Sequence, residues 1–117
     1  MVKNTEEKRR YLRLNNVLEV EYILPNSDRV HTTSTKDISA LGLRFTTNEN
    51  LEKGSTVEIK LKLPNLQNAI HASGRVAWSK KSTLEDNSPF DIGVEFLKIE
   101  EDNKNTFLKY LCDLIYG

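Results

Sequence analysis

Apolar and polar residues alternate along several short segments of the chain. The clearest segment runs from Val57 to Leu63, where the odd positions are apolar and the even positions are charged. A period of two is typical of a strand with one buried face and one solvated face. Shorter segments that are rich in β-branched and aromatic residues predict five further strands, at residues 17–22, 29–36, 43–46, 72–78 and 90–96.

The residues between these segments are typical of turns. Proline and small polar residues occupy 25–28, Pro64 closes the fourth strand, and a polar loop covers 80–89. Gly74 lies inside the fifth predicted strand, where glycine indicates a bulge or a close approach of another backbone.

The period changes after residue 100. Acidic residues at 100–102 favour the start of a helix, and five apolar residues then follow helical spacing: Phe107, Leu108, Leu111, Leu114 and Ile115. We expect the stripe of Phe107, Leu111 and Leu114 to pack on the strands, with Cys112 as a small core residue. The helix is also a candidate surface for a partner or a second copy. Six short strands and one helix predict a mainly β fold, an antiparallel sandwich or small barrel with the helix packed on it.

Composition limits the functions that remain. The 117 residues fit one domain, and 17 basic residues balance 17 acidic ones, which argues against a general binder of nucleic acid. No segment is long and apolar enough to span a membrane, and the N-terminus lacks the apolar stretch of a signal peptide. The single cysteine fits a reducing compartment. We therefore expect a cytoplasmic protein that does not insert into a membrane.

Patterns of catalytic or metal-binding residues are missing from the sequence. His31 and His71 have no metal-ligand spacing with each other or with Cys112. Neither a nucleophile elbow nor a glycine-rich phosphate-binding loop occurs. We expect a protein that is not an enzyme and that carries no metal and no cofactor.

A dense basic run near the N-terminus is more informative. Arg9, Arg10 and Arg13 lie within five residues of one another. A guanidinium group can form paired hydrogen bonds to phosphate oxygens, bind the O6/N7 edge of guanine, and stack on a base. The run is a candidate anion site, and the simpler interpretation is a solvated, charged tail.

A second candidate segment is Asp37-Ile38-Ser39-Ala40-Leu41-Gly42, between the second and third predicted strands. Asp37 and Ser39 point to the same side of an extended backbone. The carboxylate could accept hydrogen bonds from a guanine base, and the hydroxyl could donate one to a phosphate. Gly42 would permit a close approach or a positive φ angle. The alternative is an ordinary turn, because Asp and Ser both favour turns.

Together the two segments resemble the PilZ domain family, whose signature is R-x-x-x-R followed by [D/N]-x-S-x-x-G. Arg9 to Arg13 match the first motif, and Asp37 to Gly42 match the second. The strand Gly74-Arg75-Val76-Ala77-Trp78 is similar to the family's G-x-V-x-W, and Ile92-Gly93-Val94-Glu95-Phe96 to its I-G-V-x-F. The resemblance therefore covers residues 8–97.

The resemblance implies a six-stranded antiparallel β-barrel that binds cyclic di-GMP. It assigns ligand binding to the two motifs and leaves the role of Arg10 open; the candidate site residues are Arg9, Arg10, Arg13, Asp37, Ser39 and Gly42. We expect residues 1–16 to form a flexible arm and residues 17–117 to form the barrel with its helix. Ligand binding would fold the arm across the barrel and signal to a separate protein, with motility, exopolysaccharide synthesis and attachment as the outputs that the family offers.

Two other functions remain open. The first is a domain of the same fold that contacts proteins without binding the nucleotide. The second is a small barrel for single-stranded RNA or DNA, which needs exposed aromatic residues. Tyr22, Phe45 and Trp78 occupy apolar strand positions, so we expect them in the core. The oligomeric state cannot be inferred from the sequence.

Overall fold

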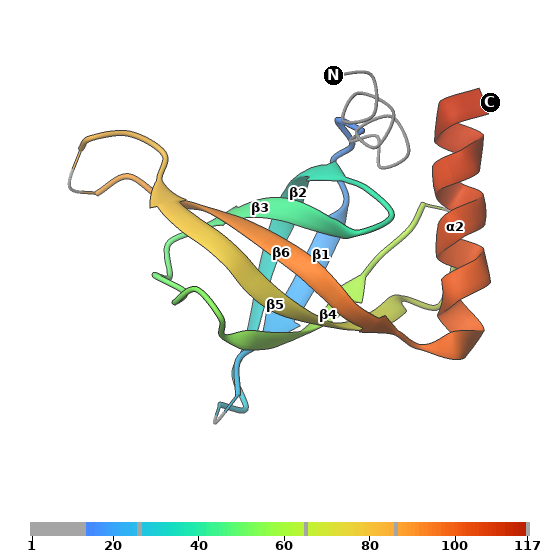
Figure 1. Ribbon diagram of the computed structural model, residues 1–117, viewed down its shortest axis with the longest axis horizontal. Coiled ribbons are helices and arrows are strands. Elements are labelled where there is room, and N and C mark those ends of the chain that lie inside the picture. Colours follow the sequence, from blue (N-terminus) through green and yellow to red (C-terminus); the bar gives the residue numbers. More distant parts are fainter. Residues whose placement is uncertain (1–13, 26, 65, 86, 117) are drawn as a thin grey trace, which may run out of the picture.

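The computed structural model describes residues 14–25, 27–64, 66–85 and 87–116, without the side chain at 102. Within these residues, six strands form a closed antiparallel barrel in the order β1-β2-β3-β6-β5-β4, followed by one helix (Figure 1). This architecture confirms the predicted six-stranded barrel with a C-terminal helix. The elements are β1 (Glu19–Ile23), β2 (Val30–Ile38), β3 (Gly42–Thr47), β4 (Thr56–Leu61), β5 (Ile70–Lys81), β6 (Phe90–Ile99) and α2 (Glu101–Tyr116).

The alternating positions of the sequence become the two faces of the barrel wall. In β4 every second residue is buried, as its charged and apolar positions predict. Tyr22 and Phe45 are almost completely buried, as expected, and their rings stack with centroids 5.0 Å apart. The barrel interior is therefore a packed apolar core, and any binding face of the wall lies on its outside.

Trp78 is the main exception to the predicted core. Ala77 is an extra residue in β5, between the pairs Val76↔Val94 and Trp78↔Gly93. This bulge shifts the alternation, so Trp78 points outward and is 36% exposed. The prediction that Trp78 lies in the core was therefore wrong.

The predicted strand boundaries also needed correction. The pairing of β2 with β3 shifts at Lys36, and β2 continues to Ile38 instead of ending at residue 36. Strand β5 extends to Lys81, into the segment predicted as a loop. The irregularity expected at Gly74 is present, because the β5–β6 register shifts between Ser73 and Gly74. Both longer strands bring polar residues onto the regular barrel wall.

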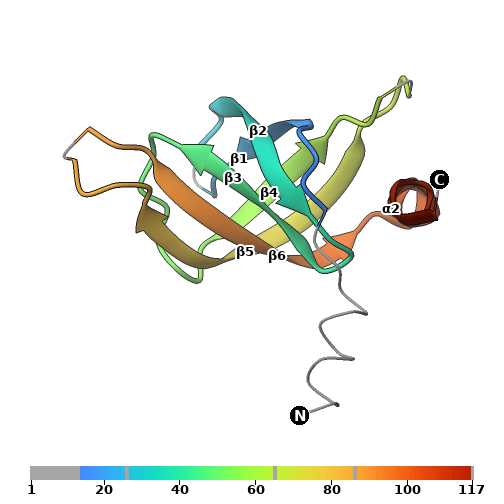
Figure 2. The ribbon, with the colours of Figure 1, turned by 90° about the horizontal axis from the view of Figure 1, so that it is seen from above.

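Helix α2 lies beside the barrel (Figure 2). It packs on the barrel through one end of its apolar stripe. Phe107 is buried edge-on against Phe96, and Leu111 is also buried. Leu114 is 39% exposed and Cys112 is exposed, so the expectation that both belong to the core was wrong. In the part of the chain that the structure describes, no helix combines the length and the hydropathy that crossing a membrane requires.

Candidate functional site

The second motif lies at the end of β2 and in the turn to β3. Ser39 is buried, its N–H donates to the carbonyl oxygen of Gly42 (2.9 Å), and its hydroxyl accepts the N–H of Leu41 (3.2 Å). The Ser39 side chain therefore builds the turn, which is one of the two roles that the sequence allows. Its predicted role as a donor to a ligand phosphate stays a prediction.

Gly42 is required at this turn because another strand lies very close. It pairs with Glu95 of β6, and a Cβ atom at position 42 would overlap the carbonyl oxygen of Val94. Among the described glycines, positive φ is found at Gly54, with φ of 92°. The close approach, not a left-handed backbone, explains the glycine at 42.

Two backbone hydrogen bonds attach the start of the described chain to the second motif. Leu14 donates its N–H to the carbonyl of Ile38 (2.8 Å), and Ile38 donates its N–H to the carbonyl of Leu14 (3.0 Å). Ile38 stands between Asp37 and Ser39, and Leu14 directly follows Arg13. Arg9, Arg10 and Arg13 themselves lie outside the described residues. The described chain therefore starts at the second motif, which sequence reasoning could not establish.

One row of outward side chains crosses four strands beside this motif. The row follows the pairs Asp37↔Arg44, Arg44↔Gly93 and Gly93↔Trp78. The indole ring of Trp78 covers Gly93, where a Cβ atom would overlap it. A carboxylate, a guanidinium and an indole therefore lie next to each other on the outer wall. Sequence reasoning missed Arg44, although its place between buried Leu43 and Phe45 already indicates an outward direction.

Arg44 and Asp37 form the charged part of this row. The Nε atom of Arg44 lies 3.0 Å from Oδ2 of Asp37, and the Asp37 side chain is only 8% exposed. Nε makes no aligned hydrogen bond with the residues that the structure describes, so the two groups attract mainly as charges.

A second polar row lies next to the first. Lys36 Nζ is 3.0 Å from Oδ1 of Asp91, and the Thr46 hydroxyl donates to the same oxygen (3.3 Å). Burial, the largest single influence, raises the pKa of Asp91. Lys36, Thr46 and the charge of Arg44 together outweigh it, so the pKa of Asp91 lies below its ordinary value of 3.8. Lys80 borders this row, with Nζ 5.9 Å from the centroid of the Trp78 ring.

The lowered pKa of Asp91 predicts a pH-dependent contribution to stability. A depressed carboxyl pKa stabilises the folded state above the unfolded pKa, and this contribution is lost as the pH falls through the folded pKa. Asp91→Asn should therefore lower the free energy of unfolding at pH 7, with a much smaller difference at pH 2.5. Urea unfolding at both pH values measures this, with exposed Glu52→Gln as control. An equal loss at both pH values would contradict it.

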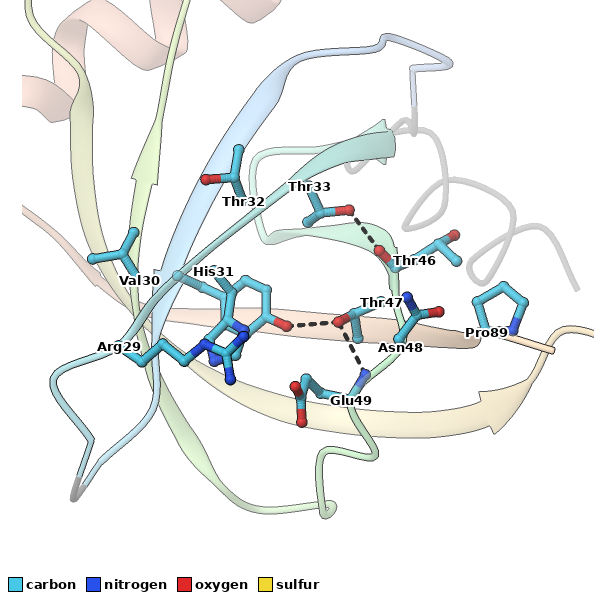
Figure 3. A pocket seen from close by; sticks show the side chains of 11 residues that line it. Arg29, Val30, His31, Thr32, Thr33, Thr46, Thr47, Asn48, Glu49 and Pro89 are labelled. Atoms are coloured by element: carbon cyan, nitrogen blue, oxygen red, sulfur yellow. Dashed lines mark hydrogen bonds between the residues drawn. The ribbon is translucent and has the colours of Figure 1, made fainter. Parts of the chain in front are cut away.

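A separate cavity of about 400 Å³ lies at the other end of the β2–β3 pairing, beyond the pair Thr35↔Phe45 (Figure 3). The Tyr22 ring stacks on His31 in this cavity, and its hydroxyl is hydrogen-bonded to Oγ1 of Thr47 (2.7 Å). Burial raises the pKa of Tyr22. Thr33 donates to the carbonyl of Thr46. Among the described residues, the cavity lining includes none of the second motif. The described chain also holds no cluster of His, Cys, Asp and Glu suited to a metal.

A family model described as "PilZ domain" matches residues 7–112. The chain belongs to the PilZ domain family. This match extends the resemblance seen in the motifs into the helix, as far as residue 112. Comparison with curated protein sequences gave no match.

Solved structures of other proteins have the same fold at low sequence identity. The Bacillus subtilis inhibitor of motility MotI/DgrA is 20% identical with a TM-score of 0.69, over 87% of this chain and 48% of that one. The PilZ domain of Escherichia coli YcgR with c-di-GMP is 14% identical with a TM-score of 0.67, over 92% and 91%. The K. pneumonia MrkH–c-di-GMP complex is 19% identical with a TM-score of 0.66, over 92% and 52%. The chain thus spans about half of MotI and MrkH and most of the YcgR domain.

Proposed function

We propose that this PilZ domain is a receptor for cyclic di-GMP that acts on a separate partner protein. The observation that carries the proposal is the pair of hydrogen bonds between Leu14 and Ile38. They attach Leu14, the residue after Arg13, to Ile38, which stands between Asp37 and Ser39. Two similar structures, the YcgR domain and MrkH, are complexes with c-di-GMP, which supports the same ligand here.

Each part of the proposed site has a distinct chemical role. Arg9 and Arg13 bind phosphate oxygens and guanine edges through paired N–H groups, and Arg10 adds charge or stacks on a base. Asp37 accepts hydrogen bonds from the N1–H and N2–H₂ groups of guanine. Ser39 and Gly42 hold the turn that fixes Asp37 in place. Catalysis is no part of this proposal, since these groups bind and position a ligand.

The arm and the barrel have separate tasks in this proposal. Residues 1–16 supply the arginines, and residues 17–117 supply the rigid wall against which the ligand is held. Repulsion among the arginines opposes a closed arm, and the phosphates of the ligand relieve it. Ligand binding then closes the arm over the barrel and changes the surface offered to a partner.

Calorimetric titration with cyclic di-GMP tests the receptor function and gives affinity and stoichiometry together. The single tryptophan, Trp78, provides a second signal, because a ligand on its row changes the surroundings of the ring. We expect heat release and a change in Trp78 fluorescence at the same ligand concentration. A flat titration with an unchanged melting temperature would contradict the receptor and favour a PilZ-fold module that contacts proteins only.

Trp78 is expected to contribute to affinity as a stacking surface for a guanine base. Base stacking on an aromatic ring contributes about 1–3 kcal/mol, and the part-exposed ring suggests the lower end of this range. Trp78→Ala should therefore weaken binding about fivefold, whereas Trp78→Phe, which keeps an aromatic face, should lose less. Calorimetry on both variants measures the two losses. Equal losses would indicate that the base does not stack on this ring.

A barrel for single-stranded nucleic acid receives less support. Such barrels bind successive bases on several exposed aromatic residues. Tyr22 and Phe45 are buried, which leaves Trp78 as the exposed member of the three candidates. One platform beside two charged rows suits a small nucleotide better than a polymer.

A further inference from the structure

The apolar stripe of α2 continues past the part of the helix that the barrel covers. Phe107 and Leu111 are buried, but Leu114, the next residue of the same stripe, is 39% exposed, and its neighbour Ile115 is 42% exposed. Tyr116 is 86% exposed. The view along the helix axis in Figure 2 shows α2 beside the barrel rather than enclosed by it. The C-terminal turn therefore presents apolar surface that the described residues leave open.

The described chain starts next to this helix. The Tyr110 hydroxyl donates to Oδ1 of Asn16 (3.0 Å), two residues after Leu14. From Tyr110 to Tyr116 the helix rises about 9 Å, at 1.5 Å per residue. An extended chain covers up to about 3.5 Å per residue, so the residues before Leu14 are numerous enough to reach either the helix end or the Asp37 face.

Charge also matches between residues 1–13 and the helix end. The last turn of α2 contains no basic residue, so no helix side chain compensates its partial negative charge or caps its carbonyl groups. Asp113 adds an exposed carboxylate. Residues 1–13 contain five basic and two acidic side chains, with Tyr11 and Leu12 inside the basic run. The segment thus offers the charge and the apolar contact that the helix end lacks.

We infer that residues 1–13 dock on the C-terminal turn of α2 when cyclic di-GMP is absent, an inference that rests on the proposed function. The arginines bind Asp113 and the last carbonyl groups, while Tyr11 and Leu12 cover Leu114 and Ile115. The same arginines cannot bind the ligand at the same time. The helix end therefore competes with the ligand for the arginines. It becomes accessible only after the ligand binds, and it then fits a partner whose contact surface is apolar with basic residues at its edge.

Weakening this docking should raise the affinity for cyclic di-GMP. The apparent dissociation constant is the intrinsic one divided by the fraction of molecules that can bind. Asp113→Lys repels the arginines and compensates the helix dipole, so binding should become about three- to tenfold tighter in calorimetry. Glu52→Lys makes the same charge change on an exposed residue of the β3–β4 loop and should change affinity less than twofold. An unchanged affinity for Asp113→Lys, or an equal gain for both variants, would overturn the docking.

A second measurement tests the docking without depending on the ligand. Cys112 is the single cysteine and is exposed on α2, so a nitroxide can be attached to it in the full chain. The amide signals of residues 8–13 should be broadened by the nitroxide without ligand and recover at saturating cyclic di-GMP. Absence of broadening in the ligand-free protein would overturn the inference.

The outcomes also separate this inference from the receptor function. Broadening that persists because cyclic di-GMP does not bind would support the docking and overturn the receptor. A second copy of the chain is the other candidate for covering the helix end. Mixing nitroxide-labelled chains with nitrogen-15-labelled chains tests this alternative. Broadening that appears fully in this mixture would show that a second copy, not the chain's own N-terminus, covers the helix end, and would overturn the docking.

Discussion

Replacing Arg13 by alanine is expected to weaken cyclic di-GMP binding about ten- to hundredfold. Arg13 directly precedes Leu14, whose backbone is bonded to Ile38 beside Asp37. A guanidinium forms charge-assisted hydrogen bonds with phosphate, and each contributes about 1.5–3 kcal/mol. Since about 1.4 kcal/mol corresponds to a factor of ten, the loss of one or two such bonds gives the expected range. Calorimetry on the full chain measures it.

Two matched variants show whether the loss belongs to the guanidinium at this position. Arg13→Lys keeps the positive charge but loses the paired N–H groups, so its affinity should fall between those of the wild type and Arg13→Ala. Arg29→Ala removes an exposed arginine that belongs to neither motif and should leave affinity within twofold. Wild-type affinity in Arg13→Ala would remove this residue from the site. Raised salt should reduce the difference between the wild type and Arg13→Ala, because the contact is ionic.

The sequence predicted the strands well because each strand shows its own local signal. The charged and apolar positions of β4 alternate without interruption, and its burial follows them. The outward direction of Trp78 could not be predicted from the local sequence pattern. The extra residue Ala77 is recognisable only from the pairing of β5 with β6, which joins residues far apart in the chain. A single bulge reverses the direction of every later side chain, so a residue predicted in the core lies on the surface.

The candidate site was predicted as two motifs, without the geometry that relates them. Asp37, Ser39 and Gly42 are close in sequence, so their common turn could be foreseen. The attachment of Leu14 to Ile38 and the row from Asp37 through Arg44 to Trp78 depend on barrel closure, which no local pattern encodes. The exposure of Leu114 also could not be predicted from a local pattern. A helical stripe indicates which side is apolar, but the size of the barrel decides how much of that stripe is covered.

Gly42→Ala is expected to cause the largest loss of stability among the single substitutions considered. Its Cβ atom would overlap the backbone carbonyl of Val94, and a backbone atom cannot turn aside as a flexible side chain can. Strands β3 and β6 must separate locally, at a cost typical of overpacking, about 2–3 kcal/mol of the free energy of unfolding. Urea denaturation measures this cost as a lower midpoint with an unchanged slope.

Gly54→Ala is the matched control. It introduces backbone strain without a steric overlap, whereas Gly42→Ala introduces a steric overlap. Gly54 has φ of 92°, and a Cβ atom there would meet no heavy atom within 4 Å, so only the strain of a left-handed backbone applies, about 1 kcal/mol. Gly42→Ala should also lose ligand affinity in conditions where it is fully folded, since the turn that holds Asp37 pairs with the displaced strand. Gly54→Ala should keep wild-type affinity. A Gly42→Ala variant no less stable than Gly54→Ala would show that β3 can move away from β6 at little cost, and that the turn at Asp37 is not held by this contact.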